Sequence, residues 1–299
     1  MKVFPELSKN AWRILLYLSY TSGTAAQIAR ESNLRLNRIS ESLDQLEEFK
    51  IIRGRGRKQQ LSLDLTMKAS LSKLLVSSSK EDLTESLEGK KLNVLFQILE
   101  GYETVKKLNL ATGYSVPTIK RILNGFQKSL FIYQPKKGIY KIRDEFLPRT
   151  KELYSSFFAC FVDRLQEQRI SWKKILIFGD YIILKSTQQE ISGFTHTAFS
   201  LFHKYGIGLI VTSDNYFVNK KELTKEEVLV HALTLSINDA RYMLYCTLFA
   251  DLNKLTLKKL KNLPVIFRVE KEIALIFEFL RKKPLSPEYI ELRRDYERS

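Results

Sequence analysis

Apolar residues recur at intervals of three and four along much of the first half of the chain, which is the pattern of amphipathic helices. The clearest stripe lies within 33–48 and consists of Leu36, Ile39, Leu43 and Leu46. After Phe49 the pattern changes to two short strand-like segments, 51–52 and 61–63, on either side of a glycine-punctuated basic turn. The sequence therefore predicts a helix followed by a β-hairpin.

Two further helices are predicted upstream, over 8–19 and 24–32. Gly23 separates them, and Thr24 with Gln27 three residues later forms a capping box at the start of the second. A fourth helix is predicted over 65–76, and the polar run that follows it is a candidate domain boundary.

The same order of elements returns 80 residues later. Under that shift, core positions of the first segment fall on apolar residues of the second, namely Ile14 on Val94, Ile28 on Leu108, Ile39 on Ile119, Leu43 on Leu123 and Ile52 on Ile132. Matching cores with divergent surfaces are expected of two copies of one fold. The second copy predicts a third helix over 116–130, capped by Ser115, and a shorter hairpin over 131–142.

A helix followed by a basic hairpin, with two short helices before it, resembles the winged helix-turn-helix family. The resemblance implies that 35–48 and 116–130 are recognition helices for the DNA major groove and that the hairpins are wings. Arginine, lysine, asparagine and hydroxyl side chains can donate hydrogen bonds to phosphates and base edges.

The resemblance implies two sets of DNA-contacting side chains. The first copy contributes Arg35, Asn37, Arg38 and Ser40 on its helix, and Arg53, Arg55, Arg57 and Lys58 on its wing. The second copy contributes Ser115, Thr118, Lys120, Arg121, Asn124, Lys136 and Lys137.

The second half of the chain has a different pattern. A long helix is predicted over 151–169, and its aromatic stripe, which includes Phe157 and Phe161, makes it a candidate dimer helix. An apolar run over 173–185, a buried strand over 207–211 and five helices between 225 and 297 follow. This predicts a mixed α/β domain that ends in a helical cluster.

The predicted fold class is therefore α+β, with three domains: winged helices over 1–80 and 81–147, and a carboxy-terminal domain over 148–299. The last domain would dimerise the protein, sense a ligand or bind a protein partner.

Charge and composition favour a polyanionic partner. The formal net charge is +16, and residues 1–80 alone carry 14 basic against 7 acidic side chains. No apolar run is long enough to span a bilayer. Pro5 and Glu6 interrupt the start of the sequence, which therefore does not resemble a secretion signal. Cys160 and Cys246 lack metal-binding spacing, so we expect buried thiols and a cytoplasmic location.

Signals for catalysis are incomplete. The stretch Ile177-Phe178-Gly179-Asp180 resembles the start of the nucleotidyltransferase motif, but Asp180 replaces the serine and no paired aspartates follow to hold metals. Asp180 and Lys185 also resemble part of a restriction-nuclease core, without its Glu-x-Lys element. We therefore expect no enzymatic activity, no metal and no cofactor.

Together these features resemble archaeal-type and phage-defence-associated tandem winged-helix regulators, and also abortive-infection antitoxins, which repress their own promoters. We expect a homodimeric, sequence-specific regulator of transcription that binds double-stranded DNA. One alternative is an antitoxin-like or scaffold protein whose winged helices bind a protein partner. Another is a nucleic-acid enzyme that acts through its carboxy-terminal domain.

Overall fold

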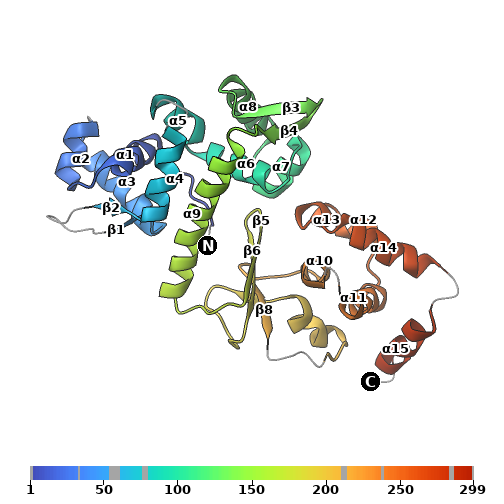
Figure 1. Ribbon diagram of the computed structural model, residues 1–299. Helices are drawn as coiled ribbons and strands as arrows, with labels where there is room; N and C mark the ends of the chain where they lie inside the picture. The colour runs from blue at the N-terminus through green and yellow to red at the C-terminus, as the bar shows by residue number, and fades with distance from the viewer. Residues whose placement is uncertain are drawn as a thin grey trace. The chain divides into compact units, whose positions relative to one another are not determined.

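The computed structural model describes residues 3–32, 34–53, 61–75, 80–209, 214–236, 239–282 and 286–297, with the side chains of 80–83 and 297 excepted (Figure 1). It combines many helices with three small antiparallel sheets, so the predicted α+β class is confirmed. Internal contacts divide the chain into two units, Lys2–Arg169 and Ile170–Ser299.

The amino-terminal unit begins with three helices and a hairpin. The elements are α1 (Lys9–Tyr20), α2 (Ala25–Ser32), α3 (Leu36–Glu48), β1 (Ile52–Arg53), β2 (Ser62–Leu63) and α4 (Leu65–Leu75). Ser8 caps α1, and Thr24 and Gln27 form the predicted capping box before α2. Gly23 forms an isolated antiparallel bridge with Leu61, which adds a third segment beside the hairpin.

After α5 (Lys80–Leu87) the same series of elements is repeated. Its members are α6 (Lys90–Leu99), α7 (Val105–Thr112), α8 (Val116–Lys128), β3 (Ile132–Lys136), β4 (Ile139–Ile142) and α9 (Leu147–Glu167). Helices α2 and α7, and likewise α3 and α8, begin and end 80 residues apart.

The repeat extends to details of the backbone. Lys50 and Leu130, which follow the third helix of each copy, both adopt positive φ angles, 58° and 61°, although neither is glycine. In both copies the next amide, of Ile51 or Phe131, donates to the carbonyl five residues earlier at 2.9 Å. The 80-residue repeat inferred from apolar positions is therefore present in the backbone conformation as well.

The last helices of the two copies, α4 and α9, pack against each other. Their contact contains a buried hydrogen bond between the hydroxyls of Ser70 and Ser156, at 3.0 Å, and an ion pair between Lys73 and Glu152, at 2.8 Å. The α4–α9 contact joins the two copies into one unit.

An aromatic cluster fills the space between the copies. Phe157 of α9 lies 6.4 Å from Trp12 of the first copy and 5.9 Å from Phe96 of the second, measured between ring centroids. All three side chains are at most 2% exposed. Hydrophobic burial of this kind is the main favourable contribution to folding.

The long helix differs from the prediction in two respects. It packs within the amino-terminal unit, so the division between units falls at Arg169 and not near residue 147. Its aromatic stripe is covered inside the chain, since Phe157 and Phe161 are 2% and 1% exposed. These rings therefore belong to the core, and the reason for proposing a dimer helix is removed.

The carboxy-terminal unit contains a sheet with the strand order β5-β6-β8-β7, in which neighbouring strands are antiparallel. The strands are β5 (Lys174–Phe178), β6 (Tyr181–Ser186), β7 (Thr195–His196) and β8 (Asn215–Val218). The 3-10 helix η1 (Ala198–Tyr205) lies between β7 and β8.

Six helices follow: α10 (Lys225–Ser236), α11 (Ala240–Leu252), α12 (Leu257–Leu260), α13 (Leu263–Ile266), α14 (Glu270–Arg281) and α15 (Pro287–Glu297). The strand predicted over 207–211 is wrong where the structure describes it, because 207–209 is irregular and the strand is β8 instead. The segment is rich in apolar residues, but an apolar run alone does not distinguish a strand from a packed loop.

No helix within the described ranges is both long enough and apolar enough to cross a membrane.

We expect Phe157→Ala to lower the free energy of unfolding by about 3–5 kcal/mol, because it leaves a cavity where both copies meet. Urea unfolding followed by circular dichroism measures this loss. Phe158→Ala, which truncates the neighbouring half-buried ring, is the control and should cost clearly less. An equal loss in both variants would contradict the role of Phe157 in joining the copies.

Candidate nucleic-acid interface

Helix α3 presents the predicted side chains of the first copy at its start. Arg35, Asn37, Arg38 and Ser40 are exposed. The guanidinium of Arg38 lies 3.5 Å from the carboxylate of Glu41, one turn along the helix. Leu36, which was predicted to join the apolar stripe, is 62% exposed.

The first hairpin is described only in part. Arg53 contacts the carboxylates of Asp64, at 3.4 Å, and Asp163, at 3.6 Å, so its charge is already compensated within the unit. The predicted wing residues Arg55, Arg57 and Lys58 lie outside the described residues.

Beyond its first turn, the exposed surface of α3 is acidic. Glu41, Asp44 and Glu48 are exposed and follow one another at intervals of three and four, so they share one face of the helix. The helix as a whole contains four acidic residues and one arginine. The prediction rests on the donors at the start of the helix and does not include this face, although the spacing of its acids is visible in the sequence.

Helix α8 presents the opposite charge on the equivalent face. Lys120, Arg121, Asn124 and Lys128 are exposed, while Ile119, Ile122, Leu123 and Phe126 are buried beneath them. The 80-residue shift places Arg121 on Glu41 and Asn124 on Asp44. The two helices therefore have the same fold position and opposite electrostatics.

The start of α8 is organised by a local cap. The Ser115 hydroxyl accepts from the Thr118 amide at 3.4 Å and lies 2.9 Å from the Thr118 hydroxyl. These two predicted contacts are thus part of the helix terminus, where exposed amides can also bind an anion.

The second hairpin continues the basic surface. Lys136 and Lys137 are exposed at its turn, where Gly138 adopts a φ of 80° that favours glycine. Lys141 on β4 is paired with Glu103 at 3.5 Å. The hairpin therefore adds two exposed lysines at its tip, and no acidic residue within 105–142 offsets their charge.

The charge of equivalent segments can be compared directly. Residues 25–62 contain eight Lys and Arg and five Asp and Glu, a net +3, whereas residues 105–142 contain eight Lys and Arg and no acid, a net +8. The difference of five charges comes entirely from acids, four of which lie in α3. The second copy is therefore the more favourable surface for a polyanion.

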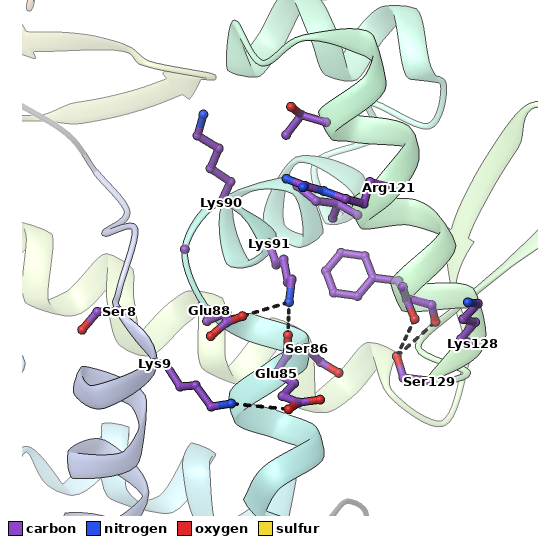
Figure 2. Close-up of a pocket in the computed structure, with 15 residues that line it drawn as sticks. Ser8, Lys9, Glu85, Ser86, Glu88, Lys90, Lys91, Arg121, Lys128 and Ser129 are labelled. Carbon is purple, nitrogen blue, oxygen red and sulfur yellow. Dashed lines mark hydrogen bonds and ion pairs between the residues drawn. The ribbon is translucent and has the colours of Figure 1, made fainter. Parts of the chain in front are cut away.

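A pocket of about 920 Å³ lies beside α8 in the amino-terminal unit (Figure 2). Ile122 and Phe126 are the large apolar residues of its lining. Its charged lining comes from both copies and consists of Lys9, Glu85, Glu88, Lys90, Lys91, Arg121 and Lys128.

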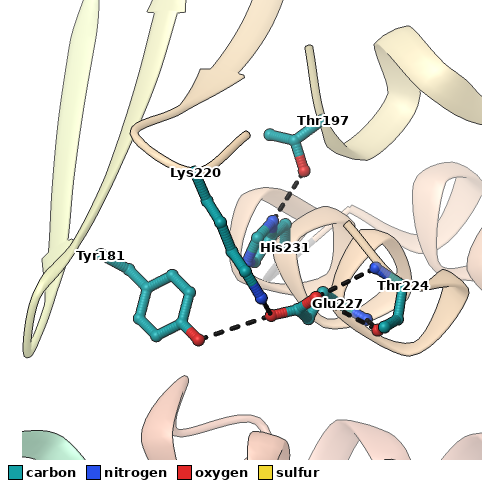
Figure 3. Close-up of polar contacts among 6 residues, drawn as sticks. All are labelled: Tyr181, Thr197, Lys220, Thr224, Glu227 and His231. Atoms are coloured by element: carbon teal, nitrogen blue, oxygen red, sulfur yellow. Dashed lines mark hydrogen bonds and ion pairs between the residues drawn. The ribbon is translucent and has the colours of Figure 1, made fainter. Parts of the chain in front are cut away.

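The carboxy-terminal unit contains a polar cluster around the buried side chains of Glu227 and His231 (Figure 3). The Glu227 carboxylate accepts from Lys220 at 2.5 Å, from the Tyr181 hydroxyl at 3.4 Å and from the Thr224 amide at 3.0 Å. One turn along α10, His231 Nδ1 lies 2.6 Å from the Thr197 hydroxyl. Thr224 and Glu227 thus form a capping box at the start of α10.

The environment of this cluster sets its protonation. Burial lowers the pKa of His231 to about 3, so the ring is neutral at physiological pH. Burial alone would raise the pKa of Glu227, but hydrogen bonds from Lys220 and Thr224 outweigh it and the net pKa is lowered. Burial and the nearby Glu227 carboxylate raise the pKa of Tyr181. Glu227 is consequently an ionised carboxylate whose acceptor sites are occupied.

The catalytic resemblances in the sequence are not supported by this geometry. Gly179, with a φ of 59°, and Asp180 form the tight turn of the antiparallel β5–β6 hairpin. Asp180 and Lys185 lie at opposite ends of β6, and the Lys185 ammonium binds Asp214 at 3.0 Å. His196 lies on β7 and His203 on η1, so the two histidines are not on one helix.

Among the described residues, no group of three or more His, Cys, Asp or Glu is placed to hold a metal ion. Cys160 and Cys246 are buried free thiols, as predicted, and burial raises the pKa of Cys160 to about 12.

Comparison with protein-family models, with curated proteins and with solved structures finds no match to this chain.

We expect His231 to make stability depend on pH. Its pKa is about 3 when folded and about 6.5 when unfolded, so the unfolded chain binds the extra proton between these values. The contribution of the neutral His231 ring to the free energy of unfolding is complete above pH 6.5 and declines as the pH falls, by at most about 1.4 kcal/mol per pH unit. Urea unfolding between pH 7.5 and 5 should therefore show that the free energy of unfolding depends less steeply on pH in His231→Gln than in the wild type. An equally steep dependence in both proteins would refute this assignment.

Proposed function

We propose that this protein is a sequence-specific regulator of transcription that binds double-stranded DNA through two tandem winged helix-turn-helix domains. The repeated order of three helices and a hairpin, in Lys9–Leu63 and again in Lys90–Ile142, supports the winged-helix assignment. In this proposal α8 is the principal recognition helix, which enters the major groove, and β3–β4 is its wing.

The observation that carries the proposal is the face of α8. Lys120, Arg121 and Asn124 are exposed together, and an arginine and an asparagine are the side chains that can bond guanine and adenine through two hydrogen bonds each. No acidic residue lies in 105–142 to repel phosphates. The Lys136–Lys137 tip extends the surface toward the backbone or the minor groove.

The first copy has a different role in this proposal. Phosphates would be repelled by Glu41, Asp44 and Glu48, so α3 does not enter a groove through this face. The predicted contacts at its start, Arg35, Asn37, Arg38 and Ser40, would then reach only the flanking backbone.

The acidic face of α3 also favours the second candidate, in which a winged helix binds a protein partner, as in an antitoxin-like protein. A basic protein would be complementary to that face. The two candidates differ in which copy carries the activity, so variants of α8 and α3 discriminate between them.

For Arg121→Ala we expect a loss of about 1–3 kcal/mol in binding to a duplex selected from a random library, with a smaller loss on random duplexes. Fluorescence anisotropy at near-physiological salt measures both affinities. The matched control is Glu41→Ala at the equivalent position of the first copy, which should leave affinity unchanged or increase it, because a negative charge is removed.

Equal losses on selected and random duplexes would show that Arg121 does not read bases. A loss caused by Glu41→Ala but not by Arg121→Ala would reverse the assignment of the two copies.

A further inference from the structure

The pocket beside α8 is shared between the two copies. Ser8 and Lys9 come from the start of α1, Glu85 and Ser86 from α5, and Lys90 and Lys91 from the start of α6. The opposite wall is α8 itself (Figure 2). The first copy therefore contributes a wall to a site on the helix that we assign to DNA recognition.

Two hydrogen bonds fix that wall. The indole nitrogen of Trp12 donates to the Leu87 carbonyl at 3.0 Å, and the Gly89 amide donates to the Leu7 carbonyl at 2.7 Å. Both bonds hold the α5–α6 joint onto the first copy. Gly89 adopts a φ of 60°, which glycine tolerates and which directs the chain into α6.

The pocket is electropositive. Five cationic and two anionic side chains line it, a net of +3. Lys9 is paired with Glu85 at 3.4 Å, and Lys91 with Glu88 at 3.3 Å and with the Glu85 carbonyl. These pairs are partly solvated, so their mutual attraction is weak and a phosphate can compete for the ammonium groups.

The remaining cations connect the pocket to the exposed face of α8. Arg121 and Lys128 line the pocket and are also exposed on that face, and Lys90 lies 4.7 Å from the centre of the Tyr114 ring. Arg121 and Lys128 therefore belong both to the pocket and to the exposed face of α8.

The pocket and the second hairpin flank α8. Figures 1 and 2 show the β3–β4 hairpin on one side of the helix and the α5–α6 joint on the other. A helix in a major groove has a phosphate backbone on each side, since the groove is only slightly wider than the helix. Lys136 and Lys137 lie on the side of one DNA strand, and the pocket lies on the side of the other.

We propose that this pocket binds backbone phosphates of the DNA strand that borders α8 on the side opposite the hairpin. The inference rests on the proposed function. It gives the first copy a defined role, in which α1 and the α5–α6 joint form half of a phosphate clamp whose other half is the second hairpin.

The test is the salt dependence of duplex binding by Lys9→Ala/Lys90→Ala. Neither residue lies on α8, so base reading is left intact. Each phosphate contact that is lost should reduce the magnitude of the slope of log K against log salt by about 0.9, so the slope of the double variant should be smaller by about 1.8. The double variant should also bind selected and random duplexes more weakly by the same factor. The matched control, Lys68→Ala/Lys151→Ala, removes two lysines from α4 and α9 and should keep the wild-type slope.

The outcomes separate this inference from the proposed function. A wild-type slope in Lys9→Ala/Lys90→Ala, with binding still reduced in Arg121→Ala, overturns the phosphate clamp alone. If neither variant changes DNA binding, the proposed role of α8 is overturned as well. Calorimetry with inorganic pyrophosphate tests the other source of phosphate, a free phosphate compound. In one outcome the wild type binds pyrophosphate saturably and the double variant does not, while both proteins keep the same slope of log K against log salt for the duplex. That result would show a site for a free phosphate compound and would also overturn the clamp.

Discussion

The arrangement of the amino-terminal unit depends on the contact between the two copies. Helices α4 and α9 pack side by side, and Phe157 fills the space between Trp12 and Phe96. Because this contact is buried and aromatic, it fixes the copies relative to each other in space as well as in sequence. The wall of the pocket beside α8, and thus the proposed division of roles between the copies, follows from it.

The two copies are alike in fold and differ in the charge of their surfaces. Their backbones repeat to the level of single positive φ angles, at Lys50 and Leu130. Yet the equivalent positions 41 and 121 hold Glu and Arg. Core positions are constrained by packing, whereas an exposed helix face can change sign at little cost in stability. In our proposal the second copy reads bases and the first supplies phosphate contacts.

Much of the local structure could be predicted from the sequence, because apolar periodicity and capping residues report directly on helices such as α3 and α8. Long-range packing could not: the stripe of α9 is equally compatible with a dimer surface and with the buried cluster around Phe157. The turn at Gly179 shows the same limit, since a strand followed by glycine fits either a catalytic motif or a hairpin. In the candidate site, donor side chains identify the basic positions, but they do not reveal the acids around Asp44 that oppose them on α3.

The most direct test of recognition by α8 is selection from a random-sequence duplex library at near-physiological salt, performed with the wild-type protein and with Lys120→Ala/Arg121→Ala. We expect an enriched motif for the wild type that is lost in the variant, while salt-sensitive binding without sequence preference persists through the lysines of the hairpin and the pocket. The same motif enriched by both proteins would contradict recognition by α8. Failure of the wild type to bind any duplex would contradict the proposed function as a whole and favour a protein partner.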